Sequence, residues 1–171
     1  ANRTILLLIA GSVEVAYFSL AFRFASVAVL VLLAFQTAWQ VQAFSSIQDD
    51  DGLSTIAHDG RRIVVSVATT TVAIAVLGPE LIRILAGDEY LPALPALAGS
   101  LGFAIAYAAY HVLTMPSALS KDMKDLGISA SVGAGTGIAL TALLAGPLGS
   151  GGTALAFLLG QMVAVGLGFT F

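Results

Sequence analysis

Residues 24–48 read FASVAVLVLLAFQTAWQVQAFSSIQ, an uncharged run that starts after Arg23 and ends before Asp49. A helix rises about 1.5 Å per residue, so about 20 residues cross the ~30 Å hydrocarbon core of a bilayer. The run is long enough for that crossing. Its opening part, residues 25–34, lacks the alternation of apolar and polar residues that is typical of membrane-barrel strands. The stretch therefore predicts a membrane-spanning helix.

Three more uncharged stretches lie at 63–79, 90–120 and 126–171, with His111 counted as neutral. The last is too long for one crossing, and its Gly- and Pro-rich segment 146–152 indicates a turn. We therefore predict an all-α membrane protein, a helical bundle of about five full transmembrane helices plus a truncated one. A single domain spans 1–171, with helices expected at 2–11 (truncated), 15–44, 61–86, 91–119, 124–146 and 152–171.

The composition agrees with this class. Of the 171 residues, 58% are hydrophobic, 10% are charged and none is Cys, and the mean hydropathy is +0.96. Soluble domains have about 25% charged residues, so a soluble globular enzyme and a disordered segment are excluded. The net charge of −3 argues against nucleic-acid binding, which needs a basic surface.

The basic residues of the expected loops indicate the orientation. Cytoplasmic loops of membrane proteins are enriched in Lys and Arg. The loops expected at 45–62 and 120–125 contain Arg61, Arg62, Lys121 and Lys124, whereas the other three contain no Lys or Arg. We predict a multi-pass protein of the plasma (inner) membrane, with loops 45–62 and 120–125 in the cytoplasm. The missing initial Met and the short first apolar run suggest a piece of a longer chain.

Motifs for catalysis or metal binding are missing from the sequence. The adjacent Asp49, Asp50 and Asp51 fit a solvated loop with a helix cap better than a metal site, because His58 and Asp59 do not complete a ligand set by spacing. We expect no enzymatic activity, no metal and no cofactor. The Gly-x-x-x-Gly motif at 133–137 lies in an apolar run, where it predicts close helix packing or a hinge.

Two charged residues are candidates for transport chemistry. Arg23 lies within an expected span, where a guanidinium can hold a phosphate bidentately. The alternative is an Arg whose charged head reaches the outer interface while its stem stays in the apolar layer. Glu14, in or beside an expected outer loop, is either an ion-coupling site or a solvated loop acid.

Four polar residues of the spans are candidate substrate contacts. Tyr107 and His111 are one helical turn apart, as are Gln36 and Gln40. A buried His can relay protons and couple transport to an ion gradient, or it can be a hydrogen-bonded packing residue. The two Gln side chains either line a hydrophilic path or join helices by hydrogen bonds.

Three segments resemble a known family. Residues 16–24 are similar to the "YSLAxRF" opening of a helix in bacterial polysaccharide and lipid-linked oligosaccharide flippases, including those of the O-antigen-flippase type. Residues 85–93 resemble their "GxEYxxA" loop, and the last two spans with the joining residues 147–154 resemble their "GxxGAA" helix pair. The order and spacing of the three segments also match, and together they cover nearly the whole chain.

The resemblance is to the multidrug, oligosaccharidyl-lipid and polysaccharide exporter superfamily, and it implies a C-terminal-half fragment of a transporter with 12–14 helices in two bundles. The implied function is movement of polyprenyl-pyrophosphate-linked sugars from the inner to the outer leaflet by alternating access, with Arg23 as the best phosphate contact. The implied partners are this substrate, membrane lipids and the missing N-terminal half. Two alternatives stay open: a multidrug efflux antiporter of the same superfamily, and a small helical membrane scaffold.

Overall fold

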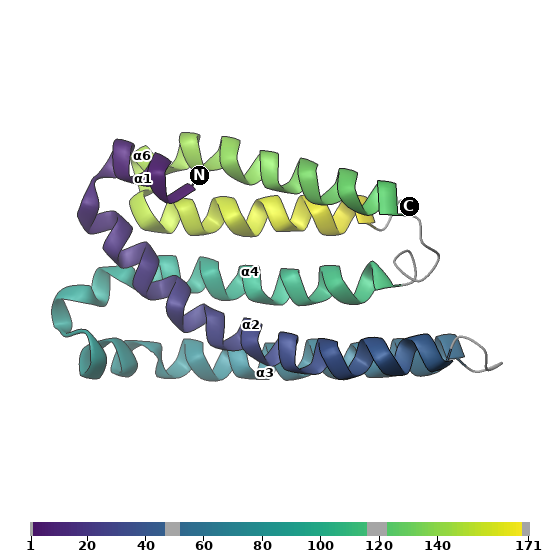
Figure 1. The fold of residues 1–171 in the computed structure, drawn as a ribbon. Coiled ribbons are helices and arrows are strands. Elements are labelled where there is room, and N and C mark those ends of the chain that lie inside the picture. Colours follow the sequence, from purple (N-terminus) through teal and green to yellow (C-terminus); the bar gives the residue numbers. More distant parts are fainter. Residues whose placement is uncertain (1, 47–51, 116–122, 169–171) are drawn as a thin grey trace.

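The computed structural model describes residues 2–46, 52–115 and 123–168, and these are helical with short connections. Figure 1 shows long helices that run side by side along one direction. The described elements are α1 (Asn2–Ala10), α2 (Ser12–Ser46), α3 (Gly52–Leu85), the 3₁₀ helix η1 (Asp88–Ala93), α4 (Leu94–Leu113) and α6 (Met123–Gly168). The prediction of an all-α class is confirmed for this part of the chain.

Four of the described helical segments are long and apolar enough to cross a membrane: 12–37 in α2, 57–85 in α3, 88–113 across η1 and α4, and 124–168 in α6. Large apolar side chains stay exposed on these helices, for example Leu30, Val76 and Leu143 at 62%, 71% and 70%. A water-soluble bundle would bury or replace such side chains. The chain is therefore a membrane-embedded protein.

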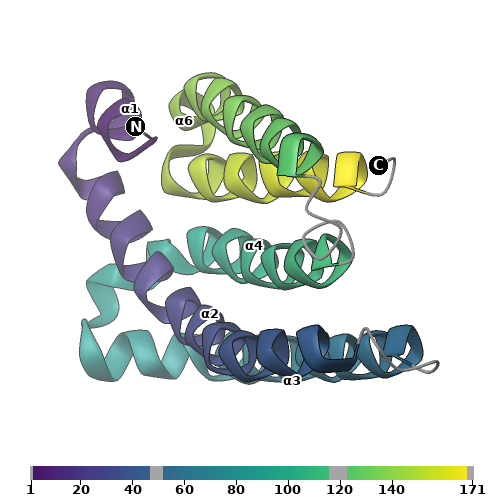
Figure 2. The same ribbon diagram turned by 45° about the vertical axis from the view of Figure 1, so that its right-hand side comes forward.

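α6 reverses direction at Gly149. Its 46 residues would extend for roughly 69 Å if straight, more than twice the ~30 Å hydrocarbon core. Gly149 has the non-helical angles φ 53° and ψ −131°, a backbone conformation that favours glycine. The two limbs, 123–148 and 150–168, pack antiparallel, because Gly133 meets Gly160 and Ala164 while Gly137 meets Ala156. Figure 2 shows the limbs side by side in green and yellow.

Small residues allow the close packing of α6 on itself and on α4. A Cβ added at Gly160 would lie 2.6 Å from the Gly133 carbonyl oxygen, and one at Gly99 of α4 would lie 2.8 Å from the Cβ of Ala154. Without a hydrophobic driving force between helices in lipid, such close backbone contact stabilises the bundle. The packing interpretation of the 133–137 motif is confirmed by these contacts.

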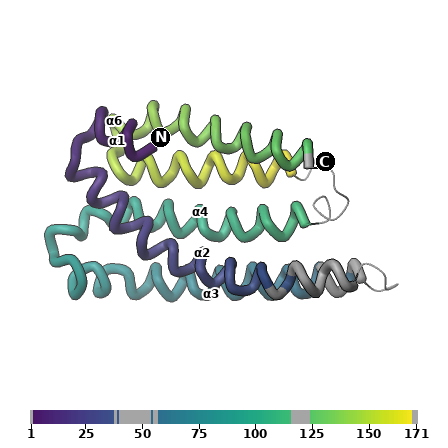
Figure 3. The backbone as a smooth tube through the Cα atoms, in the orientation of Figure 1, coloured from purple at the N-terminus to yellow at the C-terminus, as the bar shows by residue number. Residues whose placement is uncertain are grey.

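α4 is the central helix of the bundle. It contacts α2, α3 and α6, and it is the most buried of the four long apolar helices. α2 crosses the bundle obliquely, from the reversal of α6 to the far end of α3, as the smooth trace in Figure 3 makes clear. Consequently α2 contacts α1, α3, α4 and α6, and it connects the two sides of the bundle.

Several expected boundaries differ from the observed ones. α3 begins at Gly52, so most of the loop expected at 45–62 is helix, and α2 extends beyond 15–44 at both ends. Arg is a good helix former, so a helix can continue through Arg61 and Arg62 beyond the apolar layer. The hydropathy pattern therefore places the start of α3 too late. The turn expected at 146–152 is reduced to the break at Gly149. Asp49 to Asp51 and Lys121 lie outside the described residues.

The helix expected at 91–119 also differs. The chain leaves α3 through Gly87, at φ 96°, and forms η1 before α4 begins at Leu94. Pro92 lies inside η1, and Pro95 lies in the first turn of α4, where a missing N–H breaks no helical hydrogen bond. Pro79, in contrast, lies inside α3, which continues to Leu85.

Candidate functional site

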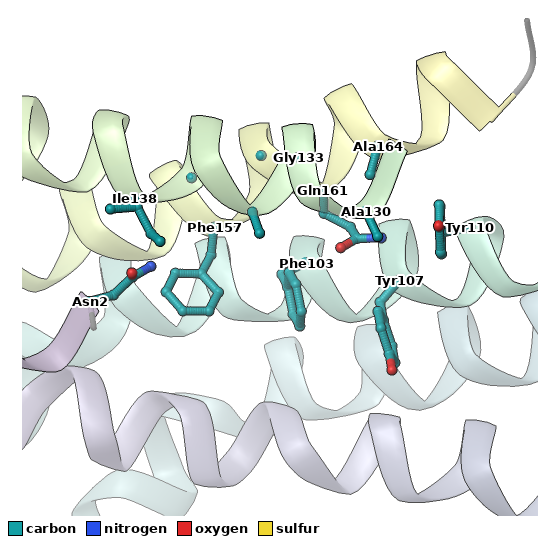
Figure 4. A pocket seen from close by; sticks show the side chains of 13 residues that line it. Asn2, Phe103, Tyr107, Tyr110, Ala130, Gly133, Ile138, Phe157, Gln161 and Ala164 are labelled. Carbon is teal, nitrogen blue, oxygen red and sulfur yellow. The ribbon is translucent and has the colours of Figure 1, made fainter. Parts of the chain in front are cut away.

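A groove of about 310 Å³ lies between α4 and the two limbs of α6, with Asn2 of α1 at one end. Figure 4 shows its wall, with Phe103, Tyr107 and Tyr110 from α4 and Phe157 and Gln161 from α6. Gly133, Gly137 and Gly160 form part of the same lining. Gly160 lies eleven positions after the reversal at Gly149, roughly 16 Å along the helix. The groove therefore lies near the middle of the bundle's length.

Aromatic side chains form a continuous cluster along this groove. The Phe103 and Tyr107 rings stack with centroids 5.6 Å apart, and Phe157 meets Phe103 edge-on at 5.7 Å. Phe18 and Phe22 of α2 extend the cluster, with centroids 5.7 and 6.2 Å from Phe157. Edge-on and offset contacts of this kind stabilise a rigid wall beyond the effect of burial alone.

A second pocket of about 310 Å³ shares Asn2 and Phe157 with the groove and adds Phe18, Phe22 and Arg3. Because two lining residues are common to both, the pockets adjoin. Neither lining contains an Asp or Glu residue. The combined concave face therefore joins an apolar, aromatic wall to a single positive charge at Arg3.

Three polar groups of the groove are free to bind a ligand. In the described part of the chain, the side chains of Asn2, Tyr107 and Gln161 make no hydrogen bond. Tyr110, in contrast, contacts the Ser129 hydroxyl at 3.1 Å and donates to the Leu126 carbonyl at 3.3 Å. Ligand sites combine an apolar lining with a few polar groups that fix orientation, and this groove has that composition.

Gln36 of α2 donates a hydrogen bond from Nε2 to Nδ1 of His111 on α4, at 3.2 Å. Because an amide nitrogen only donates, Nδ1 is the acceptor, and the proton of a neutral imidazole is on Nε2. That Nε2 is buried without a partner among the described residues. The His111 ring meets Tyr107 edge-on at 4.5 Å. Gln36, His111 and Tyr107 thus form a chain of contacts from α2 to the lining of the groove, with a hydrogen bond at its first step and a ring contact at its second.

Glu14 is engaged in a structural contact. Its Oε2 accepts a 2.7 Å hydrogen bond from the backbone N–H of Ser150, the first residue after the reversal of α6. The first N–H groups of a helix have no partner within the helix, and a carboxylate there is favoured by the helix dipole. Glu14 therefore caps the second limb of α6 instead of lying in a solvated loop.

Arg23 lies apart from the aromatic groove. It lines a separate pocket of about 530 Å³ together with Ser19, Glu89 and Tyr90. Phe22, the preceding residue, lines the second pocket next to the groove, and adjacent helical residues point about 100° apart. Arg23 thus faces the end of α3 and η1, whereas its neighbour faces α6.

The structure therefore divides the predicted site residues. Tyr107, His111 and Gln36 come together, while Arg23 and Glu14 occupy two other places. Gln40 lies on α2, and its side chain is outside the described residues. Sequence reasoning missed Arg3 and Gln161, because only the packing of α1 against α6, and of α6 against α4, brings them to one face. Among the described residues, no group of three His, Cys, Asp or Glu side chains can hold a metal ion.

Comparisons with protein-family models, with curated proteins and with solved structures found no match to the chain. The class established by the fold is a helical membrane protein.

Proposed function

We propose that this chain is the second-bundle part of a transporter that moves a lipid-linked oligosaccharide from the inner to the outer leaflet. The observation that supports this most is the groove at mid-bundle, which combines an aromatic wall, unpaired amide and phenol groups and the adjacent Arg3. A polyprenyl-linked sugar is an amphipathic molecule with a phosphate at the junction of its two parts. The groove offers a partner for each part.

The groove's chemistry fits a sugar better than a simple apolar drug. Amide groups such as that of Gln161 both donate and accept hydrogen bonds, as sugar hydroxyls do. The faces of Phe103 and Phe157 provide apolar surface without a fixed charge, and the Arg3 guanidinium suits an anionic phosphate. In this proposal, Tyr107 and Gln161 contact sugar, and Arg3 contacts phosphate.

The topology supports the same proposal. If each limb of α6 crosses once, then α2, α3, α4 and the two limbs make five crossings, as the resemblance to the flippases implies. The connections at Gly11, Gly87 and Gly149 then lie on the outer side, and Arg61, Arg62 and Lys124 lie on the cytoplasmic side. The partner half packs against the concave face, and rocking of the halves alternates access to the groove.

A multidrug efflux antiporter of the same superfamily is the second candidate. An exporter of cations needs acidic groups in its cavity, and neither lining of the groove contains one. Glu14, at the start of the α2 span, accepts a hydrogen bond from the Ser150 backbone N–H. These observations favour an anionic, lipid-linked cargo over a cationic drug.

The test is translocation of a fluorescent polyprenyl-pyrophosphate oligosaccharide by the full-length protein in liposomes. We expect Arg3→Gln and Gln161→Ala each to reduce the initial rate about five- to tenfold, since each removes a contact worth roughly 1–1.5 kcal/mol. Leu143→Ala, on the exposed face of α6, is the control and should transport like wild type. Unchanged rates in both groove variants, at equal amounts of folded protein, would contradict the proposal.

A further inference from the structure

Arg23 and Glu89 line one pocket at the end of the bundle, and the pocket has a polar lining unlike that of the aromatic groove. The apolar span of α3 ends at Leu85, and the next span begins at Asp88. Leu85, Ala86, Glu89 and Tyr90 all line the pocket. It therefore opens at the level where the apolar part of the bundle ends, which is the level of the lipid headgroups.

The two opposite charges of the pocket are not paired. In the described part of the chain, neither the Arg23 guanidinium nor the Glu89 carboxylate has a hydrogen-bond or ion-pair partner, and they do not pair with each other. The nearby Arg83 binds Glu80 at 3.1 Å and Asp88 at 3.3 Å. The acids around η1 are thus neutralised by Arg83 except for Glu89, which is left facing the pocket of Arg23.

Tyrosine rings hold the wall next to these charges. The Tyr17 hydroxyl donates to the Glu89 carbonyl at 3.3 Å, and the Tyr17 and Tyr90 rings meet edge-on with centroids 5.8 Å apart. The contact fixes η1 against α2, so the backbone of Glu89 is held next to the helix that carries Arg23. A tyrosine pair at this depth is also typical of the membrane interface.

We propose that this pocket binds the headgroup of a zwitterionic phospholipid with a primary ammonium, such as phosphatidylethanolamine. Its phosphate lies at the Arg23 guanidinium, where charge-assisted hydrogen bonds form. Its ammonium lies at the Glu89 carboxylate and beside the Tyr90 ring, a favourable place for a cation. A headgroup with both charges satisfies both unpaired residues, whereas an anionic lipid satisfies only Arg23 and is repelled by Glu89. This inference needs membrane insertion but not transport activity.

The experiment is native mass spectrometry of the full-length protein, titrated with phosphatidylethanolamine, phosphatidylglycerol or phosphatidylcholine. We expect wild type to retain phosphatidylethanolamine at least about fivefold better than the other two lipids. Phosphatidylglycerol has no ammonium, and the quaternary ammonium of phosphatidylcholine has no N–H to donate to Glu89. Arg23→Gln should weaken this binding about fivefold or more. Glu89→Gln should abolish the preference over phosphatidylglycerol, because both the attraction for the ammonium and the repulsion of the anionic lipid are removed.

Arg62→Gln is the control, because it removes an equal charge from an ion pair with Asp59 near the other end of α3, away from the pocket. It should leave the lipid preference unchanged. The helical content and monodispersity of each variant show whether it is folded. Glu89→Gln is a second variant that should preserve the fold, because the Glu89 side chain is exposed and has no partner among the described residues. Equal retention of phosphatidylethanolamine by wild type and Arg23→Gln would overturn the proposal, as would an equal loss in Arg62→Gln.

Discussion

The Glu14 carboxylate accepts a 2.7 Å hydrogen bond from the Ser150 backbone N–H, although the two residues are 136 positions apart. The bond joins the first turn of α2 to the first turn of the second limb of α6. A Cβ added at the intervening Gly149 would lie 2.5 Å from Glu14 Oε2. The reversal of α6 and the start of α2 thus contact each other directly, and the contact lies at one end of the bundle.

Removal of this cap should destabilise the bundle. We expect Glu14→Ala to lower the free energy of unfolding by about 1–2 kcal/mol, the usual effect of losing a helix cap. Glu14→Gln keeps an acceptor oxygen and should lose less. Thermal unfolding of the purified protein in detergent measures both. If Glu14 instead serves as an ion-coupling site, Glu14→Gln will leave stability unchanged and will remove the dependence of transport on the ion gradient.

Gly149→Ala should destabilise more strongly than a glycine substitution elsewhere in α6. The positive φ disfavours any side chain there, and the new methyl group would displace the Glu14 carboxylate. We expect a loss of about 2 kcal/mol or more, from strain and from the lost cap together. The measurement is again thermal unfolding.

Gly135→Ala is the matched control for that substitution, because an added Cβ at Gly135 meets nothing within 4 Å. It should stabilise the exposed helix by about 0.5–1 kcal/mol. Similar melting temperatures for the two variants would show that the reversal does not depend on glycine at position 149.

The Gln36–His111 hydrogen bond should appear as an energetic coupling between α2 and α4. In a double-mutant cycle with Gln36→Ala and His111→Ala, we expect a coupling of about 0.5–1.5 kcal/mol, because each single variant leaves the other group unpaired. Chemical denaturation of the four proteins provides the free energies. Additive effects would mean that the contact does not contribute to stability.

Labelling of single cysteines should establish the orientation. The chain has no cysteine of its own, so each introduced thiol reports alone. We expect Ala57→Cys to react only from the cytoplasm and Asp88→Cys only from outside. Both positions are exposed, whereas Ser150, in the outer reversal, is 3% exposed and unsuitable. Reaction of Ala57→Cys from outside would reverse the proposed orientation.

The sequence is sufficient to predict the all-helical membrane class, because uncharged runs report span length directly. It also locates the reversal of α6, since Gly and Pro cluster at 146–152. The sequence did not indicate that a single residue, Gly149, makes that reversal, or that α3 begins as early as Gly52. Helix ends in water depend on capping and on neighbours that a hydropathy pattern does not include.

The candidate site was predictable only where its residues share a helix turn. Tyr107 and His111 follow from their spacing, but the addition of Gln36 depends on how α2 crosses α4. The sequence predicts Arg23 as the charge within a span, but its pocket also depends on η1 and the end of α3, which pack against α2. Arg3 and Gln161 have no sequence signal that links them, because 158 positions separate them in the chain.

The most direct test of the central claim is photo-crosslinking of the lipid-linked oligosaccharide to the groove. A photoreactive amino acid replaces Gln161 in the full-length protein, and in a parallel protein it replaces Leu143 on the exposed face of α6. We predict that the Gln161 probe crosslinks to the polyprenyl-pyrophosphate oligosaccharide. Unlabelled oligosaccharide-lipid should reduce this crosslinking, and polyprenyl phosphate alone should reduce it less. The Leu143 probe should crosslink to bulk phospholipid instead. Equal crosslinking of the sugar-lipid at both positions, or none at Gln161, would contradict the account.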